Sequence, residues 1–236
     1  MKDADATAIY GSRGANGVIL ITTKKGKPGK TKFDLNIYSG AGKVASKMPL
    51  LNSSQYLEMR NEAYKNTNIV PNQYSPDLTV WDTTRYTDWQ KELIGGSAQT
   101  TDAQVAVSGG DAFTQFLIGT GFHKEGTVFP GNNSDKRFSS LFSLNNSSRD
   151  SKFKSTVAIK YAVNDSRLLN RDLTLQALTL APVAPPLYDN NGNLNWAETD
   201  WTASTPNPLA YLKTSYDAKT KNLFVNGTVS YSILPN

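Results

Sequence analysis

Residues 152–163 read Lys-Phe-Lys-Ser-Thr-Val-Ala-Ile-Lys-Tyr-Ala-Val, and this stretch carries the clearest strand pattern of the 236-residue chain. Its larger apolar side chains alternate with polar ones, and they are Phe153, Val157, Ile159, Tyr161 and Val163. The polar side chains between them are Lys152, Lys154, Thr156 and Lys160. Successive side chains of a β-strand point to opposite faces, so this period of two predicts a long strand with one apolar and one polar face.

The same alternation recurs on both sides of this stretch. Residues 222–233 repeat it clearly, and residues 31–41 place Phe33, Leu35 and Ile37 on one face. Weaker versions cover three further segments, which are residues 102–108, 113–123 and 137–145. The sequence therefore predicts six strands.

The predicted strands are joined by connections that alternate between short and long. Tight polar turns are expected at Ser108–Asp111 and Asn146–Asp150, where Gly, Asn, Asp and Ser cluster. The long connections are residues 43–101, 124–136 and 164–221. One end of the sheet should thus carry short turns and the other end large loops.

Two all-β architectures fit this pattern. Membrane barrels have short turns on one side and long loops on the other, and ten residues at roughly 3.3 Å each, tilted by about 40°, span an apolar band of about 25 Å. A soluble antiparallel sandwich can show the same alternation. The periodicity alone leaves both open.

Composition excludes much of enzyme and metal chemistry. The chain has no cysteine and a single histidine, His123, so disulfide frameworks, thiolate zinc sites and multi-histidine centres are excluded. No Gly-x-Ser-x-Gly motif offers a nucleophile to His123, which is interpreted as a polar strand or loop residue. Glu198 and Asp200 lie in a loop without the context of a glycosidase pair. We predict no catalytic residue, no metal site and no cofactor.

The net charge of +5 is concentrated near the start of the chain. Residues 1–50 hold nine Lys or Arg and three Asp or Glu, a balance of +6. The cluster from Lys24 to Lys32 contains no interleaved aromatic residues for base stacking, so it predicts a solvated linker and no nucleic-acid partner.

The first 26 residues form a unit of their own. A glycine-rich turn at Gly11–Gly17 precedes the apolar run Val18–Thr23, which predicts a buried strand. The glycine spacing is G-x-x-G-x-x-G before a strand, whereas a dinucleotide loop needs G-x-G-x-x-G before a helix, so phosphate binding is rejected. No apolar signal-peptide core follows Met1.

The long connections contain two predicted features. A helix should begin after Asn52, with Gln55 completing a capping box, and run to Tyr64. The third connection is rich in proline and aromatic residues, and Tyr188, Trp196 and Trp201 are candidates for contact with a sugar or partner protein. The alternative is that these aromatic side chains pack the loop upon itself. Asp189–Asn193 predicts a tight turn rather than a calcium loop.

A family resemblance can now be stated on particular residues. Residues 3–26 read Asp-Ala-Asp-Ala-Thr-Ala-Ile-Tyr-Gly-Ser-Arg-Gly-Ala-Asn-Gly-Val-Ile-Leu-Ile-Thr-Thr-Lys-Lys-Gly. They closely resemble the end of the plug domain in SusC/RagA-type TonB-dependent outer-membrane transporters. The likeness continues to about residue 165, through the segments 52–64, 87–90, 107–111, 121–126 and 136–138. Residues 166–236 match only in general character.

The resemblance implies a barrel of about 22 strands that is plugged from within and imports oligosaccharides or peptides. It implies the outer membrane of a Gram-negative bacterium of the Bacteroidota type, a SusD-like surface lipoprotein over the loops, and TonB as the partner that displaces the plug. Residues 1–26 would be the end of the plug, 27–31 a linker and 32–236 the first part of the barrel. The residues of the plug motif are Gly11, Arg13, Gly14, Asn16 and Gly17.

The expected fold is therefore all-β, an antiparallel transmembrane portion of about six strands of a larger barrel behind the end of a plug. Apolar strand faces would meet outer-membrane lipid and polar faces the lumen. The segments that contact TonB are not in this sequence, and the chain alone is not expected to transport. Arg13 is a candidate for a conformational role in the plug. The alternative function is a soluble β-sandwich that binds glycans through Tyr188, Trp196 and Trp201.

Overall fold

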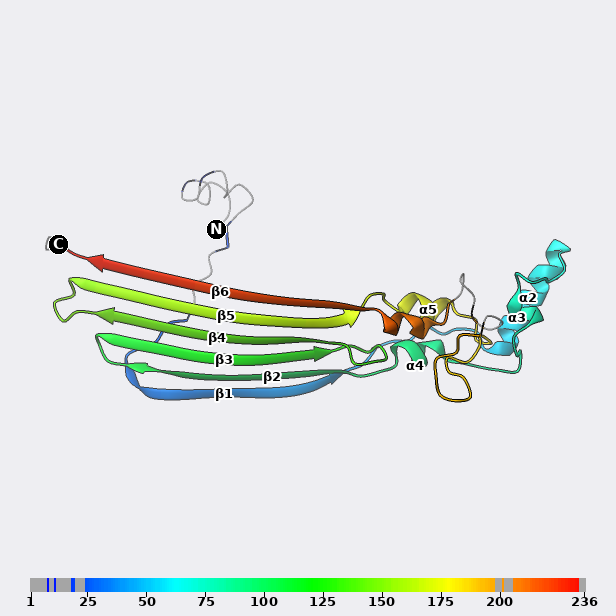
Figure 1. Cartoon of the computed structure of the whole chain (residues 1–236), viewed down its shortest axis with the longest axis horizontal. Helices are drawn as coiled ribbons and strands as arrows, with labels where there is room; N and C mark the ends of the chain where they lie inside the picture. Colours follow the sequence, from blue (N-terminus) through cyan, green and yellow to red (C-terminus); the bar gives the residue numbers. More distant parts are fainter. Residues whose placement is uncertain are drawn as a thin grey trace.

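The six strands form one antiparallel sheet, as a computed structural model of the chain shows for residues 8, 11, 18, 19, 24–197, 201 and 206–233. The strands are β1 (Gly29–Gly42), β2 (Ala98–Gly110), β3 (Thr114–Gly126), β4 (Ser134–Ser147), β5 (Phe153–Leu169) and β6 (Ser215–Tyr231). They lie side by side in sequence order (Figure 1). All six predicted strands are confirmed.

Most strands reach further toward the long loops than the pattern predicted. β6 begins at Ser215 rather than near residue 222, and β5 continues to Leu169 rather than ending near residue 163. Both contain 17 residues, about 55 Å at roughly 3.3 Å per residue. The extensions were missed because residues 164–167 and 217–221 are mostly polar on both faces, so the alternation disappears while the backbone ladder continues.

The cross-strand register assembles one continuous apolar face. Residues that face each other across a strand pair project to the same side of a sheet. One such row contains Phe33, Val107, Ile118, Phe142, Ile159 and Val225. The next contains Leu35, Val105, Thr120, Ser140, Tyr161 and Leu223. We call the side that carries these rows the apolar face and the opposite side the polar face.

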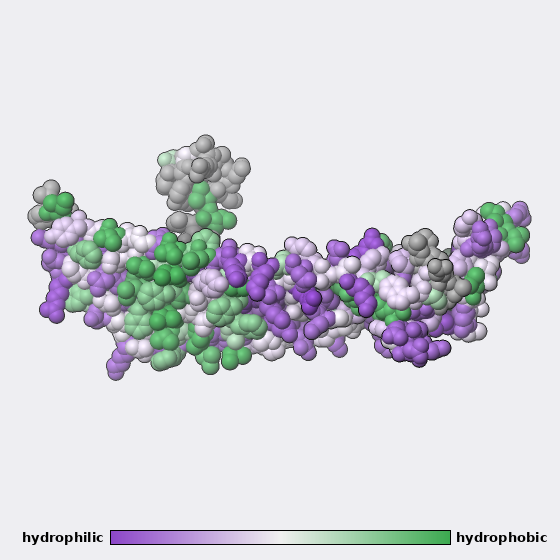
Figure 2. Space-filling view, viewed as in Figure 1, coloured by the Kyte–Doolittle hydropathy of each residue, from purple (hydrophilic) through white to green (hydrophobic). Residues whose placement is uncertain are grey.

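The apolar face is not covered by a second layer in the described part of the chain. Figure 1 shows the sheet as a single curved layer, and Figure 2 shows hydrophobic residues gathered on the surface above the strands. Phe33 is 76% exposed, Leu35 70% and Val225 66%. A sandwich would bury such residues against a second sheet about 10 Å away. The sandwich interpretation is therefore not favoured.

Short turns close one end of the sheet, as predicted. In the β2–β3 turn the Asp111 carboxylate accepts hydrogen bonds from the amides of Phe113 at 2.8 Å and Thr114 at 2.7 Å. These amides hold the pKa of Asp111 below its ordinary value. In the β4–β5 turn the amide of Ser148 donates to the carbonyl of Phe153, and Ser151 adopts φ 58°. Both turns use the side-chain chemistry that their sequences indicated.

The long connections fold together at the other end of the sheet into what we call the loop module. Its helices are α2 (Ser53–Thr67), α3 (Pro76–Thr79), α4 (Trp89–Ile94), α5 (Thr174–Thr179) and the 3₁₀ helix η2 (Pro208–Lys213). Side chains from the first and third connections share one core, with Val128 and Phe129 of the second packed against it. Leu93, Leu173 and Leu209 are at its centre and are 0–2% exposed.

The capping box of α2 is confirmed. The amide of Gln55 donates to the Asn52 side chain at 3.0 Å, and the amide of Asn52 donates to the Gln55 side chain at 3.1 Å. The helix runs one turn past Tyr64 to Thr67 and ends at Asn68, which adopts the left-handed φ of 53°. None of the helices in the described residues is long and apolar enough to cross a membrane.

Candidate functional site

The polar face of the sheet carries a row of hydrogen-bonded and charged side chains near the loop module. The register aligns Tyr38, Asp102, His123, Arg137, Asn164 and Thr220 across all six strands. Nδ1 of His123 lies 3.0 Å from a carboxylate oxygen of Asp102, and its Nε2 lies 3.7 Å from Glu125. The side-chain amide of Gln104 donates to the other Asp102 oxygen at 2.8 Å. His123 is thus a polar strand residue, as predicted, and its ring is held between the carboxylates of Asp102 and Glu125.

A trough of about 1320 Å³ lies on this face. The basic segment before β1 forms one side through Lys24, Lys27 and neighbouring residues, and Lys160 of β5 belongs to the opposite side. Gly26 lies directly against the backbone of β3, where a Cβ would come within 2.5 Å of the Phe116 carbonyl oxygen. The lysine cluster therefore borders the polar face, and glycine is required where the chain passes the sheet.

Residues 27–31, the expected linker, lead into the sheet. β1 begins at Gly29, which lies opposite Gly110 of β2, and its regular pairing with β2 starts at Lys32. Of the plug motif, Gly11 has φ 64°, a left-handed conformation that favours glycine. The other motif residues, Arg13, Gly14, Asn16 and Gly17, lie outside the described residues, as do Glu198 and Asp200.

Tyr188 and Trp196 present their rings on the surface of the loop module. Tyr188 is 51% exposed and Trp196 58%. Between them the chain forms the predicted tight turn, with Tyr188 bridged to Leu194. The carboxylate of Asp189 accepts hydrogen bonds from the amides of Asn191 at 2.8 Å and Asn193 at 2.9 Å. One oxygen of the Asp189 carboxylate thus stabilises the turn through two backbone amides.

Two buried asparagines anchor this turn to the module. Asn207, 1% exposed, donates from its side chain to the carbonyls of Leu187 at 2.8 Å and Asn195 at 3.1 Å. The Asn195 side chain in turn donates to the carbonyl of Pro186 at 3.1 Å. Neither residue was singled out from the sequence, because partners 9 to 20 positions away leave no local pattern. These hydrogen bonds hold the backbone on both sides of the turn that carries Tyr188 and Trp196.

Trp201 occupies a different environment from the other two candidates. It is 5% exposed, and its ring packs edge to face on Trp89 with centroids 6.3 Å apart. Its indole N–H donates to the carbonyl of Pro186 at 3.1 Å. Trp201 therefore packs the loop upon itself, as the alternative interpretation expected, and its ring is not on the surface where a ligand would meet it.

A buried charge cluster joins α2 to α3. Asp77 is 5% exposed and accepts hydrogen bonds from Arg60 at 2.6 and 3.0 Å and from the Tyr56 hydroxyl at 2.9 Å. Burial raises the pKa of Asp77, but the hydrogen bonds from Arg60 and Tyr56 outweigh it and hold that pKa below its ordinary value. Burial, with the neighbouring carboxylate, raises the pKa of Tyr56 to about 12.

The outer part of the loop module exposes many apolar side chains around this cluster. No residue of α2 is buried, and Met59, Ile69, Val70 and Tyr74 are between 55% and 85% exposed. Figure 1 shows α2 and α3 farthest from the sheet. Exposed apolar residues gathered on one part of a surface are typical of a site that contacts another protein.

Comparison with characterised proteins supports the resemblance that the glycine-rich motif indicated. The chain is 27% identical to TonB-dependent receptor SusC of Bacteroides thetaiotaomicron, over 98% of this chain and 24% of that protein. It is 36% identical to TonB-dependent receptor P3 of Formosa agariphila, over 56% of this chain and 12% of that protein. The chain spans about a quarter or less of the length of the curated relatives it matches. No protein-family model matches it.

Solved structures give the same answer for the fold. The structure of the RagAB peptide transporter matches 99% of this chain and 30% of that chain, with a TM-score of 0.77 and 22% identity. The RagAB peptide importer in its open-open state matches with a TM-score of 0.76 and 21% identity. The resemblance to SusC/RagA-type TonB-dependent receptors is confirmed, and so is the fold class, a six-stranded portion of an antiparallel barrel wall. These relatives are named as receptors and transporters.

Proposed function

We propose that this chain forms part of the wall and the outer loops of a TonB-dependent nutrient importer in the outer membrane. The observation that carries the proposal is the uncovered apolar face, which is continuous across all six strands and backed by a polar face. Lipid is the solvent that such a face requires, because the apolar side chains are exposed yet arranged in register. The likeness to SusC and RagAB supports the same function.

The distribution of charge supports this assignment of faces. The two central rows of the apolar face contain no charged residue in any of the six described strands. A lysine or arginine at the midplane of such a face costs about 2 to 4 kcal/mol. The strand lysines Lys154 and Lys160 project instead to the polar face, where they meet water or plug.

The orientation follows from the two ends of the sheet. Outer-membrane barrels keep short turns on the periplasmic side and long loops outside. The β2–β3 and β4–β5 turns would then face the periplasm, and the loop module would face the exterior. β1 and β6 each pair with one neighbour in the described sheet, so further strands must complete the wall before it can sit in lipid without unpaired backbone groups.

The loop module is the part of the chain that would contact the substrate and the SusD-like lipoprotein. Tyr188 and Trp196 offer flat rings of the kind that stack on sugars or pack on peptide side chains. They suit the substrate class that the resemblance to SusC/RagA-type transporters implies, which is oligosaccharide or peptide. The exposed apolar residues of α2 and the segment after it fit a SusD-like surface lipoprotein. Energy would come through TonB acting on the plug, with Arg13 as the candidate conformational residue.

Single-cysteine labelling tests this arrangement, because the chain contains no cysteine of its own. In intact cells a membrane-impermeant maleimide should label Asn190→Cys in the loop module and leave Ser148→Cys in the turn unlabelled until the outer membrane is permeabilised. Ile159→Cys on the apolar face should resist the reagent in both conditions. Rapid labelling of Ile159→Cys in a folded protein would show that this face meets water and would refute the proposal.

A further inference from the structure

Two lysines face each other at the edge of the apolar face that lies toward the loop module. Phe122 of β3 is directly opposite Phe138 of β4, and two residues further along each strand Lys124 is directly opposite Lys136. All four side chains therefore project to the apolar side. Like charges directly opposite in a strand pair are destabilising, so this pair needs a negative partner.

The carboxylates on this side of the sheet form ion pairs with other basic residues, although Asp165 lies directly opposite Lys136 in the β4–β5 register. On the same side, Asp165 pairs with Lys219 at 3.7 Å and Asp217 pairs with Arg167 at 3.1 Å. Within the described residues the structure gives no ion pair to Lys124, Lys136 or the nearby Lys221. This border of the apolar face therefore carries a net positive charge that the chain itself does not neutralise.

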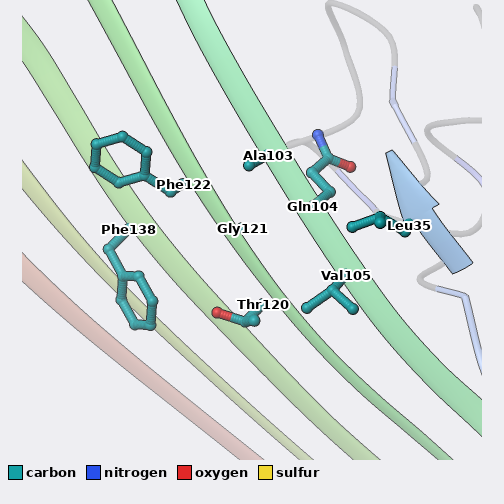
Figure 3. A pocket seen from close by; sticks show the side chains of 8 residues that line it. All are labelled: Leu35, Ala103, Gln104, Val105, Thr120, Gly121, Phe122 and Phe138. Atoms are coloured by element: carbon teal, nitrogen blue, oxygen red, sulfur yellow. The ribbon is translucent and has the colours of Figure 1, made fainter. Parts of the chain in front are cut away.

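An apolar groove begins directly below the lysine pair. It has a volume of about 260 Å³ and is lined mainly by Phe122, Phe138, Val105, Leu35, Thr120 and Ala103 (Figure 3). Ala103 and Thr120 make the depression, because their small side chains lie between larger ones. The Thr120 hydroxyl donates to the carbonyl of Ser139 at 3.1 Å, so the groove contains no unsatisfied hydroxyl there. The groove has the character of a surface that receives a hydrocarbon chain.

We propose that Lys124 and Lys136 bind the phosphate of an outer-leaflet lipid whose acyl chain lies in this groove. The inference rests on the proposed function, since only then does the apolar face meet a bilayer with the loop module outside. Side chains directly opposite in a strand pair have Cβ atoms about 5 Å apart, so both ammonium groups can reach one phosphate. The positive charges of Lys124 and Lys136 complement a phosphate headgroup, and the apolar groove beside them, which Phe122 and Phe138 help to line, complements an acyl chain.

The test measures lipid retained by the folded protein that carries this chain, purified in mild detergent. Diphosphoryl lipid A is added, and bound lipid is counted by native mass spectrometry. The double variant Lys124→Gln, Lys136→Gln should lose retention by roughly thirtyfold, since each lysine near an anionic lipid surface contributes about fivefold. The matched control is Lys154→Gln, Lys160→Gln, which removes the same charge from the polar face and should retain lipid as the parent does.

Two further arms separate phosphate recognition from general affinity for detergent or lipid. Dephosphorylated lipid A should bind the parent and the double variant equally weakly, and the charge-conserving pair Lys124→Arg, Lys136→Arg should keep the binding.

Equal retention of phosphorylated lipid by parent and Lys124→Gln, Lys136→Gln would overturn the site while leaving the importer proposal intact. A protein that does not insert into the membrane, with Ile159→Cys labelled by the aqueous reagent, would overturn both. Loss of retention after addition of millimolar inorganic phosphate alone would assign the lysines to a free anion instead of a lipid.

Discussion

The sheet and the loop module differ in whether they bury their apolar side chains. The buried hydrophobic residues of the described chain all lie in the loop module, among them Trp89, Leu93 and Leu173. The strands instead leave large side chains such as Phe33 and Leu35 exposed. The loop module thus buries its apolar side chains in a core of its own, whereas the sheet is held by its backbone ladder and leaves large apolar side chains uncovered. If the proposed function is right, one chain is adapted to lipid along its strands and to water in its loop module, and the division lies where the strands end.

The sharpest test places the same substitution in both regions. Leu93→Ala removes a side chain that is 0% exposed and should destabilise the loop module by about 2 to 5 kcal/mol through lost burial and the cavity left behind. Leu35→Ala, at a position 70% exposed, should change stability little when the protein is in detergent. Hydrogen exchange of the α4 and α5 amides would measure the first effect. Equal protection of these amides in both variants would contradict the division.

A charge placed on the apolar face tests the sheet side of the comparison. Ile159→Lys should cost about 2 to 4 kcal/mol in lipid, because an ammonium group at the midplane of a lipid-facing wall is poorly solvated. Ala158→Lys projects to the polar face and is the matched control, with a cost well below that of Ile159→Lys. Urea unfolding in lipid vesicles measures both. A larger cost for the control would reverse the assignment of the two faces.

Removing the charge of Asp77 tests whether the outer helices are held by polar contacts. Asp77→Asn leaves the partly exposed Arg60 without its carboxylate and should destabilise the α2–α3 contact by about 1 to 3 kcal/mol. Limited proteolysis in the segment that follows Thr67, the last residue of α2, measures this loss of stability. The control Asp82→Asn changes an exposed carboxylate in the same connection, and it should leave the cleavage rate unchanged. Identical cleavage rates in both variants would show that Asp77 does not stabilise the α2–α3 contact.

The same cluster predicts a pH window. The pKa of Asp77 is lowered on folding, so its contribution is present above the unfolded pKa of about 3.9 and is lost as pH falls through the folded value. The pKa of Tyr56 is raised to about 12, so its contribution is complete below the unfolded pKa of about 10 and is lost as pH rises toward 12. Protection of α2 amides should be greatest between these limits. Tyr56→Phe should abolish the alkaline loss that this residue causes and leave the acid loss in place.

The smallest expected effect concerns the start of α2. Asn52→Ala removes the side-chain acceptor for the Gln55 amide and should cost the helix about 1 kcal/mol. Ser54→Ala, within the first turn of the same helix, is the control and should be close to neutral. Exchange rates of the first-turn amides distinguish them. If Asn52→Ala also changed the exchange rates of amides in the sheet, the stability of the sheet would be coupled to that of α2.

Local pattern accounts for the parts of the fold in which a residue and its neighbours in sequence share one environment. The period of two predicted all six strands and their two faces, because alternation is a property of consecutive residues. The capping box at Asn52 and the turn at Asp189–Asn193 were also predicted, since their partners lie within four positions. The loop-side ends of β5 and β6 were missed because residues 164–167 and 217–221 are mostly polar and show no alternation, although the backbone pairing continues through them.

Residue patterns alone predict the set of strands, the two faces of each strand and the resemblance to TonB-dependent receptors. That the six strands form one layer became clear only from the folded chain, since pairing between distant segments is not encoded in any single stretch. The tertiary structure also separated Trp201, buried against Trp89, from the exposed Trp196, and it joined Asp77 to Arg60 and Tyr56. The physical reason is the same in each case: burial and charge pairing depend on which distant residues arrive at the same place, whereas periodicity and capping depend only on the next few residues along the chain.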